Sequence, residues 1–377
     1  MPINGHISAV FSSLHLLREM PFYGLTDFQL IWENETGKQR ILAMMENNGF
    51  SDFIKNSNHL AQIKCNLNNI KYYDIDDLNH HLKDKKLINF LHINTRMLSK
   101  NKGNVMGFLN MFDGEPDVLL LSEIGKDGQR YLKNTFPNYD FECDLPERNK
   151  YGGVAILTNN ETFKMNIQEN LKIKKTCDCT KCQVEDLWVN ITDGNKNIYT
   201  VGVIYRHPNG NIKHFTEQLV TVISKIPKNR SCIIAGDINI DLLNISHSDV
   251  LDYATLFMSF GFTPKIHLPT RITDNSCTLI DHIFLRLASC DKLANTFSGS
   301  VFSDISDHMP VFLGMSRGYI KPLSRPFIRI FNDRNQDKFK RKCESHDWDQ
   351  LNLLADINDK YIFFQNSLIS IYMNAFH

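Results

Sequence analysis

The central part of the chain alternates short apolar runs with longer segments whose apolar residues recur at helical spacing. Three segments predict amphipathic helices: Asn104–Phe112, Phe215–Ile226, which Pro227 ends, and Asp249–Phe260, which Gly261 closes. Alternating strands and helices predict an α/β fold in which helices cover the sheets. The apolar runs that predict strands are Leu87–Ile93, Asp117–Leu121, Val154–Leu157, Asp186–Ile191, Tyr199–Tyr205, Cys232–Ala235, Leu279–Leu285 and Pro310–Leu313.

The two ends of the chain lack this alternation. Leu25–Met45 has apolar residues at helical intervals, and Asn56–His81 is polar and rich in Asn and Asp, as loops and linkers are. After Ser316 the pattern dissolves, and it resumes as a predicted helix beyond Trp348. We therefore expect three parts: an N-terminal extension of unknown role over residues 1–85, a catalytic domain over 86–316, and a basic connector with a C-terminal helix over 317–377.

Charge and cysteine content narrow the setting of the protein. The 377 residues contain 42 Lys and Arg and 42 Asp and Glu, so no overall charge indicates a polyanionic partner. From Arg317 to Lys342, however, nine basic residues face Asp333 and Asp337, a local net charge of +7 that suits a solvated tail or a contact with nucleic acid. Nine cysteines without a paired framework indicate a reducing compartment. With no signal sequence and no apolar run of membrane length, we expect an intracellular protein, nuclear or cytoplasmic, without a membrane partner.

The candidate chemistry centres on two short segments. Gly236-Asp-Ile-Asn239 follows a strand directly, and Ser306-Asp-His-Met-Pro310 precedes another. Asp237 and Asn239 should point the same way, because strand side chains alternate. Asp307 could serve a hard cation, and His308 could face a phosphate. Together the two segments predict metal-assisted phosphoryl transfer.

Further polar residues follow the ends of predicted strands, where ligands of α/β sheets bind. Glu123 is a candidate Mg²⁺ ligand, or else a solvated loop carboxylate; Asn94 is a candidate ligand, or else a turn residue. Tyr205 is a candidate phosphate donor or a packed strand aromatic. Asp281 lies within an apolar strand and should be paired, most naturally with an imidazolium. Three close thiols, Cys177, Cys179 and Cys182, could bind zinc or form a free-thiol loop.

At this point the residues resemble those of a known group of enzymes. The chain is similar to the endonuclease/exonuclease/phosphatase superfamily, and within it to the endonuclease domain of non-LTR (LINE-type) retrotransposons. The tail after Arg325, with Pro326–Asn332 and then Asp347-Trp348, also resembles the connector that leads toward a reverse transcriptase in these elements. The matching segments are His92–Leu98, Asp117–Glu123, Tyr151–Ile156, Gly202–Pro208, Ala235–Asp241, Thr270–Thr273, Thr278–Phe284 and Ser303–Val311.

The resemblance implies a fold, a site and an activity. The fold would be a DNase I-like, four-layered α/β sandwich of two packed mixed β-sheets flanked by helices. The activity would be Mg²⁺-dependent cleavage of DNA that leaves a 3′-hydroxyl, with Mn²⁺ as an alternative ion. His308 would be held protonated by Asp281, within hydrogen-bond reach. In the implied roles Glu123, Asn94 and Asp307 serve the metal, Asp237 and Asn239 the attacking water, and Tyr205 and His308 the phosphate.

Two other functions remain open at this stage. The same catalytic set serves other phosphodiesterases, such as abasic-site nucleases, deadenylases and inositol or lipid phosphoesterases. A remnant that binds nucleic acid without cutting it is the second alternative. The chain also departs from its relatives, since Ile124-Gly125 follow Glu123, and Arg96 stands where some members have an acid.

Overall fold

The computed structural model describes residues 72–82, 87–147, 150–173, 184–273, 276–288, 296–316 and 333–376. The chain divides into two compact units, Met1–Ile320 and Lys321–His377. The first unit is built on two mixed β-sheets, and the described part of the second is helical. The helix predicted over Leu25–Met45 lies outside the described residues.

The first sheet has seven strands and mixes parallel with antiparallel pairs. The β2–β3 pair at its centre is parallel, as is β1–β14 at one edge, and the remaining neighbours are antiparallel. In spatial order the strands are β1 (Tyr72–Tyr73), β14 (Thr296–Val301), β15 (Val311–Ser316), β2 (Leu87–Asn94), β3 (Val118–Ser122), β5 (Val154–Asn159) and β4 (Tyr139–Asp144).

The second sheet has six strands, and only its β8–β9 pair is parallel. A separate two-stranded ribbon joins β11 (Arg271–Ile272) to β12 (Cys277–Thr278). In spatial order the strands of the second sheet are β10 (Thr263–Pro264), β13 (Asp281–Arg286), β9 (Cys232–Asp237), β8 (Ile198–Arg206), β7 (Val184–Asp193) and β6 (Phe163–Ile167).

Strand β3 is apolar from Val118 to Leu121 because both of its faces are buried. Val118 and Leu120 belong to the core between the two sheets, whereas Leu119 and Leu121 belong to the core on the outer side of the first sheet. Successive side chains point to opposite faces, so a strand buried on both faces reads as one continuous apolar run. The central strands were predictable for this reason.

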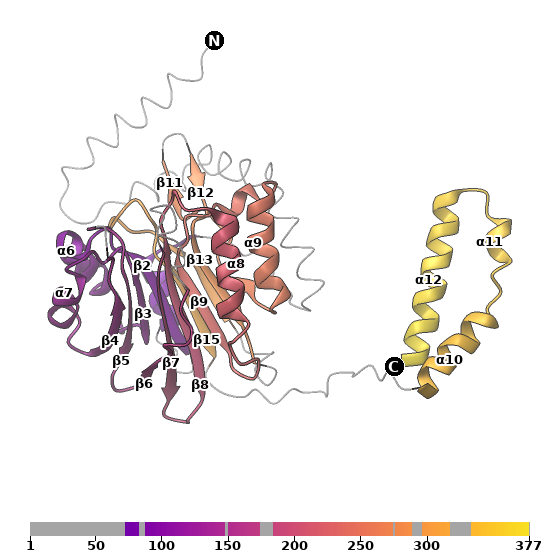
Figure 1. Ribbon diagram of the computed structural model, residues 1–377, viewed down its shortest axis with the longest axis horizontal. Coiled ribbons are helices and arrows are strands. Elements are labelled where there is room, and N and C mark those ends of the chain that lie inside the picture. Colours follow the sequence, from indigo (N-terminus) through magenta and orange to yellow (C-terminus); the bar gives the residue numbers. More distant parts are fainter. Residues whose placement is uncertain are drawn as a thin grey trace, which may run out of the picture. The chain divides into compact units, whose positions relative to one another are not determined.

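Helices cover the outer face of each sheet (Figure 1). Helix α6 (Leu98–Leu109) and α7 (Gly128–Thr135) pack on the first sheet, with α5 (Ile75–Leu82) near its β1 edge. Helix α8 (Ile212–Ile223) and α9 (Ser248–Ser259) cover the second sheet, next to the short 3₁₀ turn η2 (Leu242–Asn244). Helix, sheet, sheet and helix make four layers, which confirms the predicted DNase I-like sandwich.

Some element boundaries differ from the predictions. Helix α6 begins at Leu98 rather than Asn104, and no side chain caps its first turn. The C-terminal end of α9 follows the prediction, because Gly261 has a left-handed φ of 79° and its N–H donates to Met258. The strands that the sequence did not predict are β1, β4, β6, β10, β11, β12 and β14.

Strand β1 lies in the segment that we expected to be an N-terminal extension. It pairs with β14, and the Tyr73 ring packs edge-on against Phe297 and Phe312, with ring centroids 4.9 and 5.2 Å apart. The Tyr72 hydroxyl donates to the carbonyl of Pro269 over 2.8 Å. Residues before 86 therefore contribute to the first sheet.

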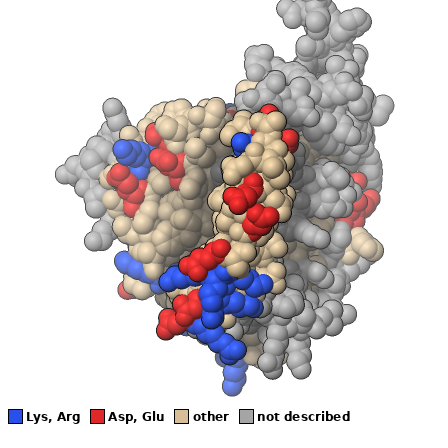
Figure 2. Space-filling model, turned by 90° about the vertical axis from the view of Figure 1, so that its right-hand side faces the viewer, with Lys and Arg blue, Asp and Glu red and all other residues tan. Residues whose placement is uncertain are grey.

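The second unit contains α10 (Asp333–Glu344), α11 (Gln350–Leu353) and α12 (Ile357–Phe376). Phe339 of α10 packs against Tyr372 and Phe376 of α12. Figure 2 shows Lys and Arg side chains gathered at the lower end of this unit, where Figure 1 places α10, which supplies Lys338, Arg341 and Lys342. None of the described helices has the length and apolar character needed to cross a membrane.

Candidate active site

The strand topology brings the predicted residues to one rim of the sandwich. Asn94 ends β2 and Glu123 directly follows β3, and these strands are parallel, so both residues lie at the same end of the first sheet. Asp237 ends β9, and it pairs across the antiparallel ladder with Asp281, which begins β13. His308 precedes β15, whose start lies beside the end of β2.

Asn94 links the two sheets at this rim. Asn94 lies on the same face of β2 as Ile88 and Phe90, because every second side chain of a strand points the same way. Ile88 and Phe90 belong to the core between the sheets, so the Asn94 side chain faces the second sheet. The Asn94 amide donates to Glu123 Oε1 over 2.8 Å and to Asp237 Oδ2 over 2.9 Å. One amide thus fixes a carboxylate from each sheet.

Glu123 accepts hydrogen bonds from neutral groups. Besides Asn94, the Tyr205 hydroxyl bonds to it. Burial, and then the charge of Glu123, raises the pKa of Tyr205 well above its usual range, so Tyr205 stays protonated and acts as a donor. Within the described residues no Lys, Arg or His forms an ion pair with Glu123. Its negative charge is therefore left for a cation to balance.

The turn after β9 holds Asp237 and Asn239 rigidly. Asn239 N–H donates to Asp237 Oδ1 over 3.2 Å, and its side-chain amide donates to the carbonyl of Arg206 over 2.8 Å. The buried Arg206 guanidinium donates in return to the carbonyls of Ile238 and Asn239 over 2.8 and 2.7 Å. Burial raises the pKa of Asp237 above the ordinary aspartate value, although His308 opposes the change.

Glycine is required just before Asp237. Gly236 has a φ of 149°, and a Cβ at this position would collide with the backbone of Ile204 on β8. The close approach of two parallel strands thus excludes any side chain there. This accounts for the glycine that opens the Gly-Asp-Ile-Asn segment.

Backbone strain is concentrated at the same rim. Within the described residues, five non-glycine residues have a left-handed φ, and four of them, Arg96, Met97, Glu123 and Asn239, lie in the turns around this site. Such conformations cost on the order of 1–3 kcal/mol each and persist at sites where function requires them. Most of the left-handed non-glycine residues in the described part of the chain therefore lie at the candidate site.

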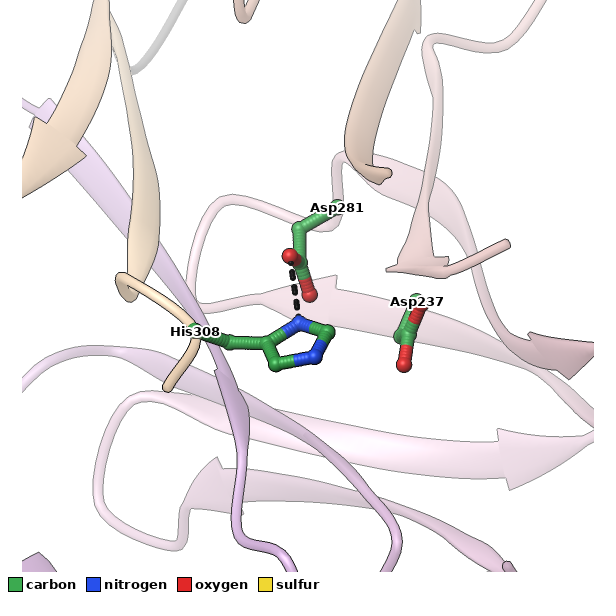
Figure 3. Close-up of side chains that lie close together, drawn as sticks. All are labelled: Asp237, Asp281 and His308. Atoms are coloured by element: carbon green, nitrogen blue, oxygen red, sulfur yellow. Dashed lines mark hydrogen bonds and ion pairs between the residues drawn. The ribbon is translucent and has the colours of Figure 1, made fainter. Parts of the chain in front are cut away.

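Asp281 and His308 form a buried ion pair, as expected. His308 Nδ1 lies 2.8 Å from Asp281 Oδ2, and the two side chains are 9% and 0% exposed. Burial lowers the pKa of His308, but the charges of Asp281 and Asp237 outweigh it and raise this pKa to about 10. Burial alone would raise the pKa of Asp281, yet His308 brings it below the ordinary value. Figure 3 shows the imidazolium between Asp281 and Asp237, with its second nitrogen turned toward Asp237.

His92 lies behind this ion pair and was not predicted. Its Nε2 is 3.1 Å from the Ser122 hydroxyl, and its Nδ1 lies 3.8 Å from Asp281 Oδ1. His92 Nδ1 and Asp281 Oδ1 are both buried, and neither has a hydrogen-bond partner. Burial lowers the pKa of His92 to about 4, so the ring is neutral. Position 92 alternates with Asn94 on the inner face of β2, a signal that could have located it.

Asp307 is held between two arginines. Arg96 Nη1 donates to Asp307 Oδ1 over 2.8 Å, and Arg271 Nε donates to Oδ2 over 2.8 Å. Arg271 Nη2 forms an ion pair with the same oxygen, also at 2.8 Å. Burial would raise the pKa of Asp307, but His308 and the two arginines bring it below the ordinary value. Its charge is thus balanced by protein groups. Arg271 was not predicted as a site residue, although its segment was among those that carry the family resemblance.

A second carboxylate–imidazole pair lies beside Tyr205. His207 Nε2 is 3.2 Å from Glu185 Oε2, and the His207 ring packs edge-on against Tyr205 with centroids 4.8 Å apart. Gly152, with a φ of 99°, leaves room for this pair, because a Cβ there would meet Glu185 Oε2 at 2.8 Å. This pair was not predicted either.

The donor groups suit a hard divalent cation at Glu123. Asp237, Asp281 and His308 offer ligand atoms within 4.8 Å of one another, but a protonated imidazole has no lone pair for a metal. Glu123 keeps an unbalanced charge and oxygen donors, which Mg²⁺ prefers. The zinc candidates Cys177, Cys179 and Cys182 lie outside the described residues.

A family model matches the central part of the chain. Residues 91–308, more than half of the chain, match the Endonuclease/Exonuclease/phosphatase family. No curated protein sequence matches the chain.

Several solved structures are similar to the chain at low sequence identity. The chain is similar to a D. rerio TDP2 humanized by 14 mutations, with 18% identity, a TM-score of 0.48, and coverage of 62% of this chain and 100% of that one. It is also similar to the endonuclease domain of TRAS1, a telomere-specific non-LTR retrotransposon, with 15% identity, a TM-score of 0.45, and coverage of 61% and 98%. For an AP endonuclease from Archaeoglobus fulgidus the identity is 14%, the TM-score 0.46, and the coverage 61% and 100%.

Proposed function

The chain belongs to the Endonuclease/Exonuclease/phosphatase family, and on that premise we propose that it is a metal-dependent endonuclease that nicks DNA and leaves a 3′-hydroxyl. We infer further that it derives from a non-LTR retrotransposon, because the sequence segments outside the catalytic set, chiefly Thr270–Thr273 and the Arg325–Trp348 connector, resemble those elements. The observation that carries the activity is the buried Asp281–His308 pair facing Asp237. His308 supplies a fixed cation, and Asp237, which faces it, supplies a carboxylate whose pKa is raised by burial.

The metal belongs at Glu123 and Asn94 in this proposal. Glu123 supplies a carboxylate that no protein cation balances, and the Asn94 amide fixes its orientation. A bound Mg²⁺ or Mn²⁺ polarises the phosphoryl oxygen and offsets the charge that develops there. Asp307, implied as a further ligand, is already balanced by Arg96 and Arg271 and is left out of this set.

Asp237 and Asn239 position and activate the attacking water in this proposal. Burial makes Asp237 a stronger base than an exposed aspartate, so it accepts the water proton more readily near neutral pH. Asn239, anchored through Arg206, keeps the loop in register with Asp237. The water oxygen forms a bond to phosphorus as Asp237 takes one water proton, and the bond from phosphorus to the O3′ of the leaving nucleotide breaks. The O3′ oxygen takes up a proton from solvent, which gives a 3′-hydroxyl and a 5′-phosphate.

The phosphate charge is met by His308 and Tyr205. Asp281 keeps the imidazole of His308 protonated to about pH 10, so the cation is present before the reaction begins. The Tyr205 hydroxyl on β8 remains protonated, and on substrate binding it would donate to the phosphate in place of Glu123. Fixed donors of this kind stabilise a transition state without having to reorganise.

The test is a plasmid-nicking assay. The purified chain should convert supercoiled DNA to open circles with Mg²⁺ and lose this activity in EDTA, and the nicks should be extendable by a DNA polymerase, which requires a 3′-hydroxyl. Glu123→Gln should abolish most of the nicking, whereas Glu161→Gln, on an exposed turn away from the rim, should not.

Three outcomes would contradict the proposal. Nicking that persists in EDTA would exclude the metal. Hydrolysis of only abasic DNA, polyadenylate or an inositol phosphate would favour another phosphodiesterase of the family. DNA binding without cleavage under any divalent cation would favour the non-catalytic remnant.

A further inference from the structure

Arg96, Asp307 and Arg271 form an exposed charge cluster at the edge of the candidate site. The Arg96 and Arg271 side chains are 61% and 41% exposed, and Asp307 between them is 28% exposed. Two positive charges face one negative charge, so the cluster presents a net positive charge to solvent. We call these three residues the exposed cluster.

The cluster is attached directly to the reacting centre. Arg96 lies two residues after Asn94, and its N–H donates to the Asn94 side chain over 2.9 Å. Arg271 forms a backbone bridge with His308, and Asp307 is the residue before His308. A ligand held by the two guanidinium groups therefore lies beside a phosphate held at His308.

The position of Arg96 is not explained by stability. Its φ of 43° is a strained conformation that costs on the order of 1–3 kcal/mol. An exposed ion pair returns at most about 1 kcal/mol. The strained turn is thus maintained for something other than the ion pair with Asp307, and it directs the guanidinium toward the rim.

Most of the donor groups on these arginines remain available. Each guanidinium has five N–H groups; Arg96 and Arg271 each use one in a hydrogen bond to Asp307, and Arg271 Nη2 also lies 2.8 Å from that carboxylate. No other acceptor for the two guanidinium groups is found among the described residues. A planar, fixed fork of N–H donors is the geometry that binds a phosphate through two oxygens. Asp307 holds both forks in place before the ligand arrives, which lowers the entropy cost of binding.

We propose that Arg96 and Arg271 bind a second phosphate of the substrate, adjacent to the one that is hydrolysed, and that Asp307 is the residue that positions them. The inference rests on the proposed function, because it takes His308 and Glu123 as the reacting centre. It narrows the substrate class to polynucleotides, in which neighbouring phosphates are linked in a row, over molecules that carry one phosphate ester.

The test compares how the full chain hydrolyses two substrates. One is a duplex DNA oligonucleotide, and the other is bis(p-nitrophenyl) phosphate, a single phosphodiester with no neighbouring phosphate. In the double variant Arg96→Gln/Arg271→Gln, KM for the oligonucleotide should rise at least about tenfold more than KM for the small diester, since two charge-assisted contacts are lost. The slope of log affinity against log salt should decrease by about 1, as expected for one phosphate contact.

Matched variants separate a positioned site from general charge. Arg230→Gln removes one arginine charge near the opposite end of β9 from Asp237, and it should leave KM for both substrates unchanged. Arg96→Lys/Arg271→Lys keeps the charge but loses the fork, and it should recover only part of the affinity. Asp307→Asn makes the site more positive, yet KM for the oligonucleotide should rise, because the arginines lose their support.

Each failure has its own signature. If the wild-type chain hydrolyses neither substrate, the proposed function is wrong. If it hydrolyses DNA and the double variant keeps the wild-type KM and salt slope, the second phosphate site is wrong. A lower oligonucleotide KM in Asp307→Asn would also overturn it, because simple attraction would then account for binding.

Discussion

Asp307 and His308 are neighbours in the chain, yet their ion pairs lie in opposite environments. The His308–Asp281 pair is almost fully buried, whereas the Arg96–Asp307–Arg271 cluster is open to solvent. Both pairs have contacts of 2.8 Å. Contact distance therefore says little about what either pair does.

The difference lies in what replaces a lost partner. Removing one member of a buried pair leaves an uncompensated charge that water cannot reach. In the exposed cluster, water and salt ions take over at little cost. The buried pair can therefore fix a protonation state, and the exposed cluster is suited to exchange a protein partner for a ligand.

The largest expected effect is on the buried pair. Asp281→Ala should lower the free energy of unfolding by about 3–5 kcal/mol, because His308 then keeps a buried charge or must lose its proton. Urea unfolding followed by circular dichroism measures this. A loss under about 1 kcal/mol would mean that His308 and Asp281 do not depend on each other.

The next effect concerns the reaction. His308→Ala should lower the nicking rate by about 10²–10³, the usual cost of losing one fixed electrostatic stabiliser of a transition state. Single-turnover cleavage at saturating Mg²⁺ measures the step, and a DNA-binding assay on the same variant serves as the control. A large loss of DNA affinity with an intact single-turnover rate would place His308 in binding rather than in chemistry.

A pH series sharpens the comparison further. The pKa of His308 rises from 6.5 to about 10 on folding, so its contribution to stability is complete below pH 6.5 and is lost as the pH rises toward 10. The raised pKa of Asp237 acts in the same direction, and the lowered pKa of Asp281 acts only in acid. The difference in urea midpoint between wild type and His308→Gln should therefore shrink between pH 6.5 and 10. A constant difference across this window would contradict the raised pKa.

The smallest expected effect is on the exposed cluster. Asp307→Ala should change the free energy of unfolding by no more than about 1 kcal/mol, and the change should decrease further in high salt. Urea unfolding at low and high ionic strength measures both. A loss comparable to that of Asp281→Ala would remove the contrast between the two pairs.

The sequence predicted the strands buried on both faces. In a chain whose strands alternate with helices, a continuous apolar run such as Leu119–Leu121 is typical of a strand buried on both faces. Strand β4 (Tyr139–Asp144) was missed because its polar residues are half-exposed at the sheet edge, and β1 was missed because two residues carry no periodicity. The start of α6 was missed because no capping residue marks it.

The site residues that the sequence predicted are those at which a polar residue interrupts or ends an apolar run. Asp281 inside an apolar strand required a partner, and His308 is that partner. The arginines around Asp307 could not be found in this way, because Arg96 and Arg271 are far apart in the chain and their side chains are partly exposed, where charged residues are ordinary. Only the topology that joins the rims of two sheets brings them to one aspartate.

Strand β1 has a consequence for how the chain can be shortened. A protein that began at residue 86, where the apolar pattern starts, would lack Tyr72 and Tyr73 and would leave the outer backbone groups of β14 unpaired. An exposed strand edge is a template on which another chain can add. The ring of Tyr73 also fills the space above Gly299, so its loss would uncover Phe297 and Phe312. Shortened proteins that keep residues 72–82 should stay monodisperse, and those that begin at 86 should aggregate.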